Sequence, residues 1–230
     1  WVNDYVIWAT VLNRAQNQLD LYFVDAASGK TRRVLSEKSD TWIETDNNLQ
    51  FLKSGDKFTW PSWRDGHTHL YLYSFDKANP LADAKLVNQI TKGDFEVQKV
   101  EGFDEGAGTV YFTSNAGDDR QGHLCSVKLD GSNFQILTQS KPGMHDAALS
   151  PNARNYVDHF SALMTPPELA FCRVGGSCET FWRSKSIDSL NLVAPQFVDF
   201  KAEDGTTLHG LLFLPPNSEG KKIPLVNNPY

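Results

Sequence analysis

The chain has 230 residues, enough to bury one large or two small hydrophobic cores. Hydrophobic residues make up 40% of it and charged residues 22%, as in ordinary globular proteins. The net charge of −6 argues against a nucleic-acid-binding surface, and no apolar run approaches the roughly 20 residues of a membrane-spanning helix.

Short β-type runs separated by turn signals follow one another along the chain, and helical periodicity is nearly absent. A typical unit is the run 124–129, which is followed by the turn Asp130-Gly131 and then by the run 134–138. The other predicted strands over this part of the chain are 21–25, 33–35, 58–62, 69–73, 86–91, 111–115, 147–150, 155–158 and 168–171. This pattern predicts a mainly β fold.

The predicted strands form a repeat. Leu21, Leu70, Leu124 and Leu169 occupy corresponding positions that are 45 to 54 residues apart. A period of roughly 40–50 residues with four strands per unit is typical of β-propeller blades. We therefore predict a partial β-propeller of about four four-stranded antiparallel blades over residues 1–190. Because blades bury their faces against their neighbours, we expect an apolar sheet face to be exposed at each end.

A different pattern begins at about residue 191. The runs 197–201 and 208–214 flank Asp204-Gly205 and predict a hairpin, and 223–226 predicts the start of another strand. The last nine residues, 222–230, have the character of a core strand that is cut off at its end. We therefore expect residues 191–230 to begin a second domain, and the chain to be part of a longer protein.

The three cysteines do not by themselves indicate whether the protein belongs to an oxidising or a reducing compartment. Five residues, including a pair of glycines, separate Cys172 from Cys178, so the chain could turn back to close a disulfide between them. Two unpaired thiols fit the spacing equally well. A bridge would indicate an oxidising compartment. Cys125 lies in a predicted strand, where we expect it to act as a small buried apolar residue.

Several segments taken together carry a family resemblance. They are 12–17, 58–73, 91–97, 157–161 with 165–167, 204–216 and 228–230. In this order and spacing, they make the chain similar to the dipeptidyl peptidase IV branch of the prolyl oligopeptidase superfamily, the S9B-type serine peptidases. The resemblance covers nearly the whole chain.

The resemblance implies a fold and an activity for the parent protein. Family members have an eight-bladed propeller that caps an α/β-hydrolase domain, so residues 1–190 would be the C-terminal half of the propeller and 191–230 the first strands of the hydrolase. The family removes N-terminal dipeptides, Xaa-Pro or Xaa-Ala, from peptides and uses no cofactor. Its partners would be a peptide substrate, the remaining blades and hydrolase domain, and a second copy in a homodimer. The resemblance implies no nucleic acid and no membrane span, and a periplasmic or secreted location.

Tyr230 is the one catalytic residue that the resemblance suggests within this chain. Asn228-Pro229-Tyr230 matches a family segment whose tyrosine donates its hydroxyl hydrogen to the oxyanion of the tetrahedral intermediate. A positioned phenol can stabilise such a charge by a few kcal/mol. The alternative is an ordinary aromatic residue at a strand end.

The remaining catalytic groups are missing from the sequence. A serine hydrolase needs a nucleophile, a base and an acid, and its nucleophile sits in Gly-x-Ser-x-Gly, which does not occur here. We therefore expect the chain alone to be inactive, with the blades gating and shaping the chamber of the parent enzyme. The alternative is a non-catalytic propeller that binds a protein or a small ligand; a third option is a carbohydrate-active β-domain.

Five other groups of residues invite a functional interpretation. His67 and His69 alternate on a predicted strand and could bind a metal, although packing or a loop contact is the preferred interpretation. We expect Glu101, Asp104 and Glu105 to form a solvated turn. We expect the loop 118–120 to lie at the surface. We expect Asn13 and Arg14 to fix a turn by side-chain hydrogen bonds to backbone carbonyls; the alternative is that Arg14 faces the central cavity and meets substrate. Four tryptophans are predicted to pack between blades: Trp42, Trp60, Trp63 and Trp182.

Overall fold

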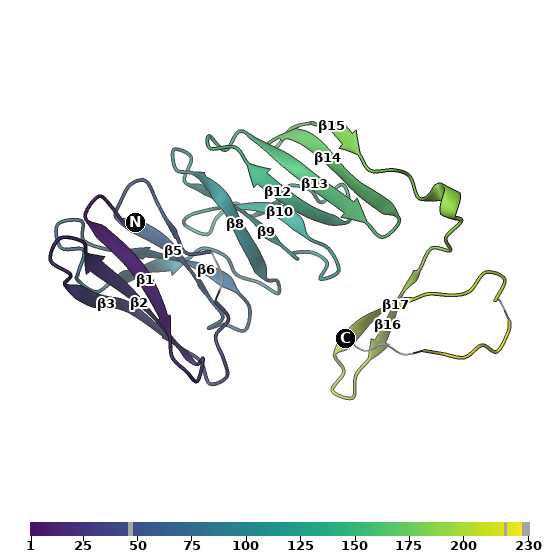
Figure 1. The fold of residues 1–230 in the computed structure, drawn as a ribbon, viewed down its shortest axis with the longest axis horizontal. Helices are drawn as coiled ribbons and strands as arrows, with labels where there is room; N and C mark the ends of the chain where they lie inside the picture. Colours follow the sequence, from purple (N-terminus) through teal and green to yellow (C-terminus); the bar gives the residue numbers. More distant parts are fainter. Residues whose placement is uncertain (46–47, 219, 227–230) are drawn as a thin grey trace.

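The computed structural model describes residues 1–45, 48–218 and 220–226. Four antiparallel sheets follow one another along the chain and are arranged in an arc, followed by a separate two-stranded hairpin (Figure 1). The predicted mainly β, propeller-like fold is confirmed. No helix within the described ranges is long and apolar enough to cross a membrane.

Each sheet is a meander in which neighbouring strands pair in chain order. The first sheet consists of β1 (Val6–Leu12), β2 (Gln18–Asp25) and β3 (Thr31–Lys38). The second consists of β4 (Gln50–Phe51), β5 (Lys57–Ser62), β6 (His69–Ser74) and β7 (Lys85–Gln89). The prediction of four strands per sheet is therefore wrong for the first sheet, which has three in the described part of the chain.

The third and fourth sheets have four strands each, as predicted. The third consists of β8 (Val97–Asp104), β9 (Thr109–Ser114), β10 (His123–Lys128) and β11 (Gln135–Ile136). The fourth consists of β12 (Met144–Leu149), β13 (Asn155–Ala162), β14 (Thr165–Arg173) and β15 (Cys178–Arg183). Gly143 is required where β12 begins, because its φ is +151° and a Cβ there would lie 2.6 Å from the Phe160 ring.

The sheets stack through both of their faces. Because side chains alternate along a strand, Tyr71 and Tyr73 of β6 pack toward the first sheet, while Leu70 and Leu72 pack toward the third. The same alternation on β10 directs Cys125 toward the second sheet, as part of the predicted buried core. Three successive apolar clusters therefore hold the four sheets together.

The repeat of leucines marks equivalent strands but not equivalent burial. Leu21, Leu70 and Leu124 are fully buried, whereas Leu169 is half-buried and the neighbouring Ala170 is buried instead. The reason is that β14 belongs to the last sheet, which has a neighbour on one side only. Its other face leaves Phe171 51% exposed, in line with the predicted uncovered sheet face.

The hairpin follows a short 3-10 turn, η1 (Asp188–Leu190), and consists of β16 (Gln196–Lys201) and β17 (Thr207–Leu212). Gly205 adopts a φ of +87° in the connecting turn, as the predicted Asp-Gly signal requires. The predicted strand at 223–226 is wrong, because no strand forms there among the described residues. A strand needs a hydrogen-bonding partner, and the described part of the chain supplies none to this segment.

Candidate functional site

The residue with the most specific predicted role cannot be placed. Tyr230 lies outside the described residues, so its role as an oxyanion donor stays a prediction. The described residues contain no group of three or more potential ligands arranged for a metal ion. What the structure describes is a set of charged and polar side chains on the sheets.

The inner edges of the third and fourth sheets come together at β8 and β12, the first strand of each. These two strands contact each other, and β12 also contacts β9 and β10 of the third sheet. We call the edge where β8 faces β12 the inner wall. A cavity of about 360 Å³ opens between β8 and β12, lined by Gln98, Lys99, Thr113, Met144, His145, Asp146, His159 and Ser161.

Lys99 connects the two sheets across this cavity. Its Nζ lies 3.0 Å from Oε2 of Glu101 on the same strand and 3.5 Å from Oδ1 of Asp146 on β12. The hydrogen bond with Glu101 raises the pKa of Lys99. The ammonium group therefore remains charged and ties one carboxylate of each strand together.

Glu101 is buried, so its predicted place in a solvated turn is wrong. Its side chain is only 3% exposed, and its Oε1 has no hydrogen-bond partner. Burial raises the pKa of this carboxyl group. The strand is irregular at this point, since the pairing with β9 shifts between Val100 and Gly102 and leaves Glu101 unpaired in the ladder. This irregularity was not visible in the sequence.

Behind the inner wall, the side chains of His145 and Asp158 form a buried pair. Nδ1 of His145 lies 2.8 Å from Oδ2 of Asp158, and its Nε2 lies 2.7 Å from the carbonyl oxygen of Lys141. Both ring nitrogens therefore lie within hydrogen-bond distance of an oxygen atom. Because Nε2 is already bonded to the backbone and the side chain is 1% exposed, this pair fixes β12 on β13 and has no free nitrogen for acid–base chemistry.

The sequence contains His-Leu at 69–70 and again at 123–124, and each pair is tied by a threonine to the end of the next strand segment. Nδ1 of His69 lies 3.0 Å from Oγ1 of Thr91, which also accepts a hydrogen bond from the backbone N–H of Leu70. His123, Thr138 and Leu124 repeat the arrangement in the third sheet. Burial lowers the pKa of His123, which keeps the ring neutral and able to accept from the threonine hydroxyl. The sequence showed the period but not the threonine partner.

His67 lies in the turn before β6, so the prediction that it alternates with His69 on a strand is wrong. Its Nδ1 is 2.8 Å from Glu96 and its Nε2 is 3.1 Å from Asp94. Both nitrogens are used by carboxylates, which matches the preferred interpretation of a loop contact and leaves neither free for a metal.

Only one of the four tryptophans packs between sheets as predicted. Trp60 is 2% exposed and donates from Nε1 to Glu37. Trp42, Trp63 and Trp182 are 65%, 59% and 48% exposed, so the packing prediction is wrong for these three. They lie in a loop, in a turn and on the edge strand β15, where no neighbouring sheet covers them in the described chain.

The fourth sheet is cross-linked at two places. Cys172 and Cys178 stand opposite each other on β14 and β15 and form a disulfide, with their Cα atoms 4.0 Å apart. Glu168 accepts a hydrogen bond from Lys141 and another, at 3.1 Å, from Nε of Arg183. The hydrogen bond from Lys141 lowers the pKa of Glu168, so this carboxylate stays ionised.

The turn at Asn13 forms by side-chain hydrogen bonds, but with the opposite polarity to the prediction. Oδ1 of Asn13 accepts hydrogen bonds from the backbone N–H groups of Asn17 and Gln18, whereas the prediction had the side chain donating to carbonyls.

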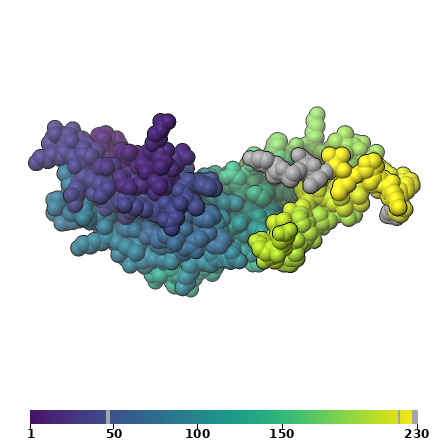
Figure 2. Space-filling view, turned by 90° about the horizontal axis from the view of Figure 1, so that it is seen from below, coloured from purple at the N-terminus to yellow at the C-terminus, as the bar shows by residue number. Residues whose placement is uncertain are grey.

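The loop at 118–120 is exposed, as predicted, but it also contacts the hairpin. Arg120 lies 3.8 Å from Asp199, and Asp119 lies 3.4 Å from His209. Figure 2 shows the hairpin, in yellow-green, against the teal surface of the third sheet.

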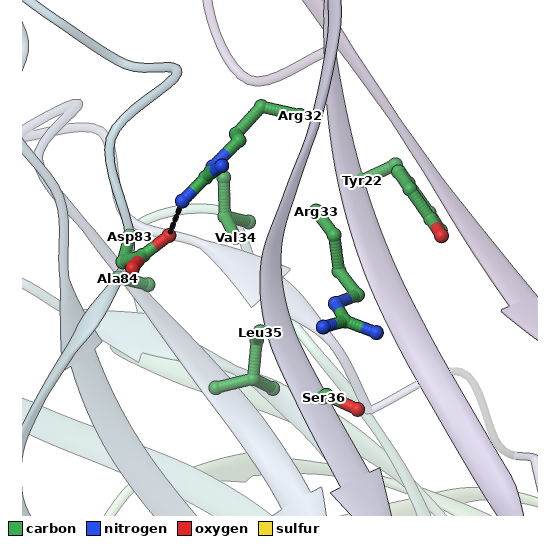
Figure 3. Close-up of a pocket in the computed structure, with 8 residues that line it drawn as sticks. All are labelled: Tyr22, Arg32, Arg33, Val34, Leu35, Ser36, Asp83 and Ala84. Atoms are coloured by element: carbon green, nitrogen blue, oxygen red, sulfur yellow. Dashed lines mark hydrogen bonds and ion pairs between the residues drawn. The ribbon is translucent and has the colours of Figure 1, made fainter.

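A second hollow, of about 570 Å³, lies on the first sheet (Figure 3). Arg32 on β3 forms an ion pair of 2.7 Å with Asp83 across it, and Arg33 points to the other side of the strand. Arg32 and Asp83 are 55% and 69% exposed, so water screens the pair and it contributes little stability. Arg33 lies 3.6 Å from Asp20, so both arginines that line the hollow are paired with carboxylates.

The chain resembles fungal and bacterial dipeptidyl peptidases. A probable dipeptidyl-aminopeptidase B of Aspergillus oryzae is 26% identical over 254 aligned positions, which cover 100% of this chain and 27% of the relative. A probable dipeptidyl peptidase 4 of Aspergillus flavus is 26% identical and is matched over 31% of its length. The chain therefore spans about a third or less of the length of these relatives.

The fold is also found in a solved structure. The crystal structure of Porphyromonas gingivalis dipeptidyl peptidase 4 superposes with a TM-score of 0.80, at 23% identity, over 93% of this chain and 30% of that one. The model of the dipeptidyl peptidase IV (DPP IV) N-terminal region matches residues 1–167. Since that match covers well over half of the sequence, the chain belongs to the dipeptidyl peptidase IV N-terminal region family.

Proposed function

We propose that this chain is the propeller portion of a serine exopeptidase that removes N-terminal dipeptides, Xaa-Pro or Xaa-Ala, from peptides. Residues 1–190 are the later half of the propeller, and 191–230 begin the hydrolase domain. The observation that carries the proposal is the match of the whole chain to dipeptidyl peptidases, together with an arc of sheets whose inner edge carries charged side chains. Blades surround a central channel, so this edge would face the chamber.

The role proposed for the sheets is to gate and shape that chamber. Lys99 and Asp146 stand on the two strands of the inner wall, where a peptide chain would pass them. The nucleophile, base and acid lie outside this chain, and Tyr230 supplies an oxyanion donor in the complete enzyme. The complete enzyme is proposed to be a homodimer without a cofactor, in the periplasm or secreted, where the disulfide between Cys172 and Cys178 is stable.

Activity of the complete protein and of this chain tests the proposal. The protein encoded by the complete gene should release p-nitroaniline from Gly-Pro-p-nitroanilide, and the 230-residue chain should not. In the complete protein, Tyr230→Phe should lower kcat by about 10²–10³-fold. Absence of turnover in the complete protein would instead favour a non-catalytic propeller that binds a protein or a small ligand. In that case the encoded sequence would also lack Gly-x-Ser-x-Gly after Tyr230.

The gating role has a test of its own. Lys99→Ala in the complete protein should change kcat/KM for peptides of ten or more residues while leaving turnover of the short chromogenic substrate unchanged. Arg32→Ala, on the first sheet away from the inner wall, is the matched control and should change neither. If both variants affect long and short substrates alike, the inner wall does not gate.

A further inference from the structure

The loop between β9 and β10 is held in one conformation by its own side chains. Arg120 donates from Nε to Oδ1 of Asp118 at 2.9 Å, from a terminal nitrogen to Oδ2 at 2.9 Å, and from its backbone N–H to Oδ1 at 3.0 Å. These hydrogen bonds lower the pKa of Asp118 and raise that of Arg120, so both stay charged. The loop therefore presents a fixed guanidinium group beside the carboxylate of Asp119.

The guanidinium group of Arg120 faces the hairpin. It lies 5.1 Å from the ring centre of Phe197 on β16, within the range of a cation–π contact. One of its terminal nitrogens is 3.8 Å from Oδ1 of Asp199 on the same strand. Nothing in these contacts depends on pH near neutrality, since arginine remains charged throughout.

The second contact between the loop and the hairpin does depend on pH. His209 on β17 pairs directly opposite Asp199, and its Nδ1 lies 2.6 Å from Oδ1 of that residue. Its Nε2 is 3.4 Å from Oδ2 of Asp119 in the loop. Each ring nitrogen thus faces a carboxylate, and only the doubly protonated imidazolium can satisfy both.

Apolar burial contributes little to the attachment of the hairpin. Five of the six residues in β16 are exposed, and Phe200 and Leu208 remain 54% and 41% exposed. The segment between β15 and β16 contains a single 3-10 turn among its described residues. Contacts between charged groups of the loop and the hairpin therefore contribute much of the free energy of docking.

We propose that the β9–β10 loop is the docking surface for the β16–β17 hairpin and that His209, when protonated between Asp199 and Asp119, is a pH-dependent latch. Facing it are the two carboxylates from β16 and from the loop, with Arg120 and Asp118 next to them. A proton on both ring nitrogens is needed for both contacts, so docking is stronger at mildly acidic pH, where aspartates are still ionised, than at alkaline pH. The proposal does not rest on the proposed function.

Fluorescence energy transfer within the 230-residue chain tests the latch. Dyes attached at Gln139→Cys and Glu203→Cys, both exposed positions, report on how close the hairpin is to the sheets. The remaining thiol, Cys125, is buried and does not compete for label. We expect the ratio of docked to undocked hairpin to rise about two- to five-fold between pH 8 and pH 5.5, the range for a partly exposed ion pair.

Three variants decide whether His209 is responsible. His209→Gln should abolish the pH response, and Asp119→Asn should do so while leaving the pair within the hairpin intact. His159→Gln, which removes an exposed histidine of the fourth sheet, should respond like the parent chain. A pH-independent signal in the parent chain, or an unchanged response in His209→Gln or Asp119→Asn, would overturn the proposal.

Discussion

Strands β9 and β16 have similar compositions and opposite environments. Each has six residues, including one valine and two aromatic residues. All six residues of β9 are buried, whereas five of the six in β16 are exposed. The difference lies in their neighbours, because β9 belongs to a sheet that is covered on both faces and β16 to a two-stranded hairpin. Burial in this molecule is therefore a property of stacking between sheets.

The same contrast separates the third sheet from the fourth. Apolar side chains join the third sheet to both of its neighbours. The fourth sheet has a neighbour on one side and carries a disulfide, a buried His–Asp pair and a carboxylate shared by two basic residues. The sheet with apolar contacts on one face only is thus the one that carries a disulfide and buried polar pairs. Four sets of substitutions test this difference between the sheets.

The largest effect is expected in the stacked core. Phe112→Ala removes a fully buried ring of β9 and should lower the free energy of unfolding by about 3–5 kcal/mol. Phe200→Ala in β16, a 54% exposed ring, should cost less than about 1 kcal/mol. Urea denaturation of both variants provides the comparison. Equal losses would mean that the hairpin is as well packed as the sheets.

The disulfide of the fourth sheet comes next. Replacing both Cys172 and Cys178 with serine opens a short loop and should cost about 2 kcal/mol of unfolding free energy. Reduction of the parent chain with dithiothreitol should have the same effect, with Cys125→Ser as the control for the remaining thiol. If reduction leaves the urea midpoint unchanged, the bridge does not support this sheet.

Glu168→Gln should cost about 1–3 kcal/mol at pH 7, because the hydrogen bonds from Lys141 and Arg183 lose a charged acceptor. The pKa of Glu168 is lowered on folding, so its contribution is present above the unfolded pKa of about 4.3 and is lost as the pH falls through the folded value. The stability difference between variant and parent should therefore shrink in acid. A difference that is constant from pH 7 to pH 3 would show that the charge is irrelevant.

The smallest effect, of opposite sign, is expected for Glu101. Because burial raises the pKa of Glu101, the folded chain binds the proton more tightly, and stability falls as the pH rises from about 4.3 through the folded value. Glu101→Gln should remove this fall and leave the chain at pH 7 as stable as the parent, or about 1 kcal/mol more stable. In this variant Lys99 would keep its ion pair with Asp146. Glu203→Gln, at an exposed position, is the control, and a clear loss of stability in Glu101→Gln would contradict this account.

The regular parts of the fold could be predicted because they depend on local patterns. The leucine period marked equivalent strands from Leu21 to Leu169, and Asp204-Gly205 marked the hairpin turn. Predictions about environment were less reliable. Glu101 was expected in solvent and is buried at a strand irregularity, while Trp42, Trp63 and Trp182 were expected in the core and are exposed. Those outcomes depend on which sheet lies opposite, and no local pattern contains that information.

The candidate site shows the same division. The leucine period marked Leu70 and Leu124, each of which directly follows a histidine, but it gave no sign of Thr91 and Thr138. These threonines lie 22 and 15 residues after His69 and His123 and form hydrogen bonds with them. It placed 118–120 at the surface but gave no sign that this loop meets a hairpin that begins at Gln196. Contacts between residues so far apart in the chain arise only when the sheets have been stacked.

The sequence by itself determined the β-strands, their spacing, the turns and the family resemblance, because alternation, turn chemistry and repeat length are encoded over a few residues. Only the tertiary structure decided that Lys99 and Asp146 meet at an inner edge and that His209 reaches Asp119. These contacts depend on how successive sheets are arranged around the arc and on where the hairpin lies against the third sheet. Such long-range geometry results from the sum of many packing contacts.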